Sequence, residues 1–158
     1  MKKALCLLLA VVTLLALCSC EAKSLESAQK ALEKKDYYVE DLPMDEFFLD
    51  EMDGKILIAF EKKGVDPDQY SDWDGDALYQ TKNFVWVFYC ENETDAEDMY
   101  EQIKEVTSSF NERMEELFED EEEKEEAEAN GMVRKKAVCE KNGNVVYFGT
   151  KAAIKIAK

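Results

Sequence analysis

The sequence predicts an α+β fold, a two-layer sandwich in which a mainly antiparallel sheet packs against one long and one or two short helices. Residues 83–90, NFVWVFYC, are aromatic and β-branched on both faces, as in a central strand. An apolar stripe with helical spacing begins at residue 96 and runs for about six turns. Asn142-Gly143, between two strand-like runs, predicts a hairpin of antiparallel strands.

The first half of the chain supplies a helix and two strands. Ser24 is a suitable helix cap, and Leu25, Ala28 and Leu32 recur at helical spacing with charges on the opposite face. Asp36 is expected to end this helix, and a strand is expected to begin with residues 37–39. Residues 44–54 are interpreted as a short helix and a turn, although the spacing of their apolar residues does not clearly indicate a helix. Residues 55–63, KILIAFEKK, are predicted to form the next strand.

An acidic loop is expected over residues 64–82, because five aspartates, a proline and two glycines interrupt any periodicity there. After the central strand, Thr94 and Glu97 form the pattern of a capping box at the start of the long helix. The apolar stripe of that helix is predicted to consist of Ala96, Met99, Ile103, Val106, Phe110, Met114 and Leu117.

The acidic end of this helix spans residues 119–130. Eight acids and one lysine occupy the ten positions 119–128, so this segment either continues as a solvated helix or frays, and Asn130-Gly131 ends it. The hairpin follows, and KAAIKIAK, residues 151–158, predicts a short terminal helix. The predicted order of elements is α-β-(α)-β-β-α-β-β-α, within a single domain of residues 25–158.

The N-terminus has the pattern of an export signal. Met1-Lys2-Lys3 is followed by Ala4 to Cys18, which is 15 residues without a charge. A membrane-spanning helix needs about 20 apolar residues, so this run is short for a permanent anchor. A buried core helix is the alternative, but it would not explain the two lysines at the start.

Residues 17–20, Leu-Cys-Ser-Cys, resemble the lipobox of bacterial lipoprotein precursors. The resemblance implies cleavage between Ser19 and Cys20, and a covalent diacylglycerol on Cys20. Residues 1–19 would then be a cleaved signal peptide, residues 20–24 a tether, and the location the extracytoplasmic face of the cell membrane. The alternative, a metal or redox pair of Cys18 and Cys20, requires both cysteines to persist beside further ligands.

The second half of the chain is similar to the C-terminal part of small uncharacterised lipoproteins of Gram-positive bacteria. This similarity spans about 65 residues and consists of a strand, a capped helix, and an Asn-Gly hairpin leading into GTKAAIKIA. It implies no particular activity.

The charge of the chain limits its partners. Removal of residues 1–19 would leave 18 basic and 36 acidic residues, a formal charge near −18. Such a charge argues against nucleic acid, whose binding needs cationic side chains, and against tight contact between the domain and an anionic membrane face. It permits a basic protein or peptide, or divalent cations, as a partner; solubility alone also explains it.

Two cysteines remain within the domain, Cys90 and Cys139, both in predicted strands. An exported protein meets an oxidising compartment, so a disulfide between them is one interpretation. It requires neighbouring strands, because the Cα atoms must lie within about 7 Å. Two buried free thiols are the other interpretation.

The loop DPDQYSDWDGD offers a candidate calcium site at Asp72, Asp74 and Asp76, because Ca²⁺ prefers several oxygen ligands on a flexible turn. The loop does not match an EF-hand, since Tyr70 and Thr81 occupy the first and last ligand positions. A solvated surface loop is the alternative interpretation.

No catalytic motif is complete. The chain has no histidine, which excludes mechanisms that use imidazole as a base. We therefore expect a non-catalytic binding or structural module of the cell envelope, lipid-anchored through Cys20 and without a cofactor. The alternatives are an acidic inhibitor or adaptor that captures a basic envelope protein, or a weak divalent-cation-binding module.

Overall fold

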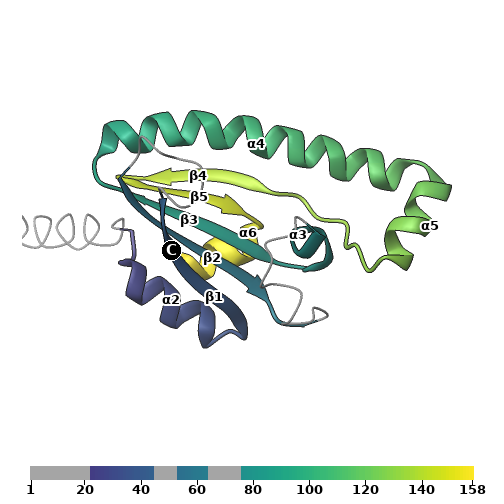
Figure 1. Ribbon diagram of the computed structural model, residues 1–158, viewed down its shortest axis with the longest axis horizontal. Helices are drawn as coiled ribbons and strands as arrows, with labels where there is room; N and C mark the ends of the chain where they lie inside the picture. The colour runs from purple at the N-terminus through teal and green to yellow at the C-terminus, as the bar shows by residue number, and fades with distance from the viewer. Residues whose placement is uncertain (1–21, 45–52, 64–75) are drawn as a thin grey trace, which may run out of the picture.

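The computed structural model describes residues 22–44, 53–63 and 76–158. In this part of the chain, five antiparallel strands form one sheet with the order β1-β2-β3-β5-β4 (Figure 1). The strands are β1 Tyr37–Pro43, β2 Gly54–Glu61, β3 Phe84–Cys90, β4 Val138–Asn142 and β5 Val145–Gly149. The helices are α2 Leu25–Glu33, α3 Asp76–Gln80, α4 Glu93–Glu119, α5 Glu121–Ala129 and α6 Lys151–Ala157.

Strand β3 lies at the centre of the sheet, as its sequence predicts. It pairs with β2 on one side and with β5 on the other, both antiparallel. Its side chains alternate between two apolar clusters: Phe84 and Phe88 belong to the cluster under α4, and Val85 and Val87 to the cluster under α2 and α6. Both faces of β3 are therefore buried, which explains why its sequence shows no polar alternation.

The predicted α+β sandwich with an antiparallel sheet is confirmed, and the helices cover both faces of the sheet. The long helix α4 lies along one face, whereas α2 and α6 pack side by side on the other (Figure 1). Ala28 and Leu32 of α2 meet Ala153, Ile154 and Ala157 of α6 in one buried cluster. The three alanines among them leave room for the two helices to approach each other, while Leu32 and Ile154 fill the cluster between the helices and the sheet.

The start of α4 differs from the prediction. The helix cap is Asn92, whose Oδ1 accepts hydrogen bonds from the backbone amides of Thr94 and Asp95 at 2.9 and 3.0 Å. The Asn92 side-chain amide in turn donates to the Asp95 carboxylate at 2.8 Å. This reciprocal arrangement begins the helix at Glu93, so the prediction that Thr94 is the cap is wrong.

The buried stripe of α4 also differs from the prediction at two positions. Val106 is 46% exposed, and Thr107 is buried in its place. Thr107 lies four residues after Ile103, and its hydroxyl donates to the Ile103 carbonyl at 2.6 Å, which satisfies the buried oxygen. At the end of the helix Phe118 is buried where Leu117 is only partly so. Which residues of α4 are buried therefore depends more on their angular position around the helix than on the hydrophobicity of each side chain.

The C-terminal hairpin and helix agree with the prediction. Strands β4 and β5 pair from Val138 opposite Gly149 to Asn142 opposite Val145. Gly143 in the turn has a φ of 59°, a conformation that glycine adopts at little cost. Helix α6 follows directly, and the backbone amide of Thr150 before it donates to the Phe84 carbonyl at 3.0 Å, which joins the helix start to β3.

Candidate functional site

Most of the site residues predicted from the sequence lie outside the described residues. Ser19 and Cys20 precede residue 22, and Asp72 and Asp74 fall in the 64–75 gap. Asp76 is the first residue of α3, but its side chain is not described. The lipidation site and the calcium loop therefore stay predictions. Within the described ranges, no group of three or more potential ligand residues could hold a metal ion.

The two cysteines of the domain are both free, with Cys90 buried and Cys139 partly buried. The interpretation as a disulfide is wrong for this structure, because β5 lies between β3 and β4. Cys139 faces Phe148 of β5, which faces Trp86 of β3, so Cys90 lies four residues further along β3. Two strand spacings and four residues of rise separate the Cα atoms of Cys90 and Cys139 by about 16 Å, far beyond the reach of a disulfide. Burial raises the pKa of both thiols to about 11, which keeps them protonated and unreactive at neutral pH.

The strongest chemical feature of the described chain is the end of α4 together with α5 up to residue 128, that is residues 112–128, which we call the acidic corner. It contains eleven acidic and two basic residues, a net charge of −9. The two bases are ion-paired within it, Arg113 to Glu116 and Lys124 to Glu121, each at 3.3 Å. Ion pairs within the described residues thus account for only two of the eleven acids.

Asp120 produces the corner by ending one helix and starting the next. Its backbone is extended, with φ −85° and ψ 133°, which interrupts the helix after Glu119. Its carboxylate accepts hydrogen bonds from the backbone amides of Glu122 and Glu123 at 2.8 and 3.2 Å and so caps α5. The acid run is therefore helical rather than frayed, which was one of the two predicted alternatives. It forms a separate helix, α5, that turns away from the axis of α4 (Figure 1).

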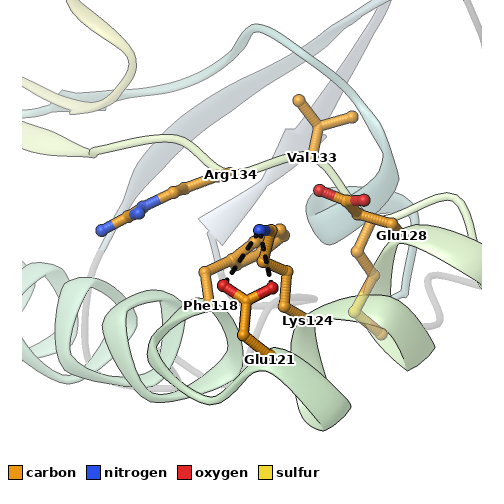
Figure 2. A pocket seen from close by; sticks show the side chains of 7 residues that line it. Phe118, Glu121, Lys124, Glu128, Val133 and Arg134 are labelled. Carbon is orange, nitrogen blue, oxygen red and sulfur yellow. Dashed lines mark hydrogen bonds and ion pairs between the residues drawn. The ribbon is translucent and has the colours of Figure 1, made fainter.

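A groove of about 380 Å³ lies inside the corner, between the end of α4, α5 and residues 132–134. Figure 2 shows Phe118 at its base and the Glu121–Lys124 pair at its mouth. Arg134 extends along the side of the groove and has no hydrogen-bond or ion-pair partner among the described residues. The groove thus combines an apolar floor with charged walls of both signs.

Hydrogen bonds hold the segments on either side of the corner, at residue 111 before it and at residues 132–137 after it. The side-chain amide of Asn111 donates to the Ala137 carbonyl at 3.0 Å, and its oxygen accepts from the Ala137 amide at 2.9 Å. The backbone amide of Met132 donates to the backbone carbonyl of Ala127 at 2.9 Å. Lys135 donates to the carbonyls of Tyr79, at 2.8 Å, and Thr81, and burial lowers the pKa of its ammonium group to about 8. The corner itself is attached to the core by Met114, Phe118 and Ala127, which are buried in the cluster under α4.

The corner has the chemistry of a binding surface for cations. Its acids are exposed, Glu121 to 83% even within its ion pair, so they attract a partner without prior desolvation. The sequence identified the acid run, but not the groove, because Phe118 and Arg134 meet α5 only after the chain turns at Asp120. An aspartate between two helical patterns is the signal for that turn, since aspartate is a preferred helix cap.

The comparisons with known proteins give no further information on the site: the chain matches no protein-family profile, no curated protein and no solved structure. In the part of the chain that the structure describes, no helix has both the length and the apolar character needed to cross a bilayer.

Proposed function

We propose that the protein is a lipid-anchored module on the extracytoplasmic face of the membrane, whose acidic corner binds a basic protein or peptide. The single observation that supports this function is the concentration of eleven acids against two bases in residues 112–128, on a surface that packs on the core through Met114, Phe118 and Ala127. Solubility alone does not require the acids to be gathered at one end of the molecule.

The anchor is inferred from residues 1–20. The basic start, the uncharged run and Leu17-Cys18-Ser19-Cys20 together resemble a lipoprotein signal. Two acyl chains on Cys20 would hold the protein stably, since each buried methylene contributes about 0.8 kcal/mol.

The position of the corner suits this arrangement. Ala22 lines a shallow hollow together with the turn between β4 and β5. That turn lies at the end of the sheet opposite α5 (Figure 1). Helix α4 spans 27 residues, which is about 40 Å at 1.5 Å per residue. An anchor at Cys20 would leave the corner accessible to proteins in the surrounding envelope.

The anchor is tested by the mass of the N-terminal peptide of the membrane-bound protein. We expect acyl chains on Cys20, and we expect Cys20→Ala to leave the precursor uncleaved. If Cys20→Ala is processed normally into a soluble form, the protein is secreted without a lipid.

Binding is tested with a decalysine peptide as the probe, by calorimetry at 50 and 300 mM salt. The variant Glu122→Gln, Glu123→Gln, Glu125→Gln, Glu126→Gln removes four acids of the corner. We expect it to weaken binding about tenfold at the lower salt concentration, and the affinity of the wild type to fall steeply with salt.

The matched control removes the same charge from elsewhere, at Glu91, Glu93, Asp98 and Glu105, all exposed and without an ion pair among the described residues. A control variant that weakens binding as much as the corner variant would show that only the net charge acts, and would contradict the proposal. The same peptide crosslinked to the protein should label α5 in the wild type.

A further inference from the structure

The charge of the molecule differs sharply between the two helical layers. Residues 93–129, which form α4 and α5, contain 17 acids and three bases, a net charge of −14. Residues 22–36 and 151–158, which contain α2 and α6, carry seven lysines and three acids, a net charge of +4. We call the latter the basic layer. The remaining residues carry a net charge of −6, so the formal charge of −16 for the whole chain conceals one basic layer.

Four lysines of the basic layer are exposed and have no ion pair among the described residues: Lys34, Lys35, Lys151 and Lys155. Lys151 and Lys155 are four residues apart and so lie on one side of α6, opposite the buried Ala153 and Ile154. Two of the three acids in the layer are compensated, because Glu26 pairs with Lys30 and Asp36 lies 3.9 Å from Lys62.

The start of the described chain is attached to the same layer. Lys23 donates from its Nζ to the Ile156 carbonyl near the end of α6 at 2.8 Å, and Ala22 packs against the cluster under α2 and α6. Only Glu21 separates Ala22 from Cys20, so the Cα atoms of these two residues lie within about 7 Å of each other. A lipid on Cys20 would therefore enter the bilayer directly beside the basic layer.

We propose that the basic layer is a membrane-docking face, which lies on an anionic lipid surface while α4 and α5 point away from it. This inference rests on the proposed lipid anchor. Charge complementarity favours the orientation twice, because it brings the lysines to the anionic headgroups and keeps the acids of α4 and α5 beyond the range of strong repulsion. Each lysine near such a surface favours the docked orientation about fivefold.

The test uses the mature protein purified from membranes, after the mass of its N-terminal peptide has established the acyl chains. It is reconstituted into vesicles of phosphatidylcholine with 30% phosphatidylglycerol, or of phosphatidylcholine alone. A water-soluble amine reagent then modifies accessible lysines, and peptide masses report each site. We expect Lys151 and Lys155 to react several-fold more slowly on the anionic vesicles, and Lys104 of α4 to react equally on both. Salt at 0.5 M should remove the difference.

Paired variants complete the test. In the wild type we expect Lys34 to be protected on anionic vesicles as well. Lys151→Gln, Lys155→Gln should restore its reactivity there, because the docked orientation loses most of its advantage. The control Lys104→Gln, Lys124→Gln removes the same charge from the opposite layer and should leave Lys34 protected. Equal reactivity of Lys151 on both vesicles, or protection of Lys104 in the wild type, overturns the docking face. An N-terminal peptide without acyl chains instead overturns the anchor on which it rests.

Discussion

The hydrogen bonds between Asn111 and Ala137 join α4 to the segment that leads into β4, and they yield a quantitative prediction. Ala137 is only 1% exposed, so its backbone groups have little access to water. The variant Asn111→Asp keeps the shape of the side chain and its acceptor, but it cannot donate to the Ala137 carbonyl. The carbonyl then lacks its partner and faces a carboxylate.

The expected loss is worked from this geometry. An unsatisfied buried carbonyl costs about 1–3 kcal/mol, and repulsion from the carboxylate adds to it. We expect Asn111→Asp to lower the free energy of unfolding by about 2–3 kcal/mol, measured by urea unfolding followed by circular dichroism. Asn111→Ala should cost about as much, because both backbone groups of Ala137 then lose their partner.

The control is Gln102→Glu, which makes the same amide-to-acid change at an exposed position of α4. It adds the same charge to the acidic layer, and we expect it to change stability by less than about 0.5 kcal/mol. If Asn111→Asp falls within that range as well, the pair of hydrogen bonds contributes nothing to stability, and the attachment of α4 must depend on apolar packing alone.

Three further predictions concern the sheet. Tyr147→Phe should stabilise the protein by about 1 kcal/mol in thermal unfolding, because the buried Tyr147 hydroxyl has no hydrogen-bond partner; a lower melting temperature would argue against this. Gly149→Ala should prevent folding or severely destabilise the protein, since a Cβ would lie 2.3 Å from the Phe84 carbonyl oxygen. Its control is Gly131→Ala, which lies in open space with φ 76° and should lower the free energy of unfolding by only about 1 kcal/mol. Stability should fall as the pH rises from 8.5 towards 11, because the thiols of Cys90 and Cys139 have pKa values near 11 when folded and ionise earlier when unfolded. The fall should be smaller in Cys90→Ala, Cys139→Ala, and an identical slope in urea midpoints against pH would contradict it.

The elements with a strong local pattern were predictable. Three of them are β3 with its two apolar faces, the Asn142-Gly143 turn and the six-turn stripe of α4. Each is encoded by a pattern within its own segment, so the sequence predicts it without information on the segments that pack against it. The cap of α4 was missed because Asn92 and Thr94 are both good caps and the choice depends on where β3 ends. Strand order was not predicted from the sequence; the structure places β5, which is buried throughout, beside β3.

The distribution of the helices could not be predicted from periodicity. A stripe of alanine and leucine shows that α2 has a buried side, but not which face of the sheet it covers. The charge difference between the layers, the candidate docking face and the groove below α5 all depend on that choice. For the same reason the net charge of the chain predicts repulsion from an anionic surface, although one face of the protein is basic.

The contact between α2 and α6 has a consequence for how the chain acquires its structure. The first helix of the domain packs against the helix that comes last in this sequence, and β3 receives β5 only after some 55 intervening residues have been added. Contacts between distant segments form late, because the loops between them must close first. While the N-terminal part emerges alone, α2 lacks its partner α6, and β3 lacks both β5 and α4, so the sheet and its two covering layers stay incomplete. If the protein is exported as we propose, this delay would help it to stay unfolded during translocation.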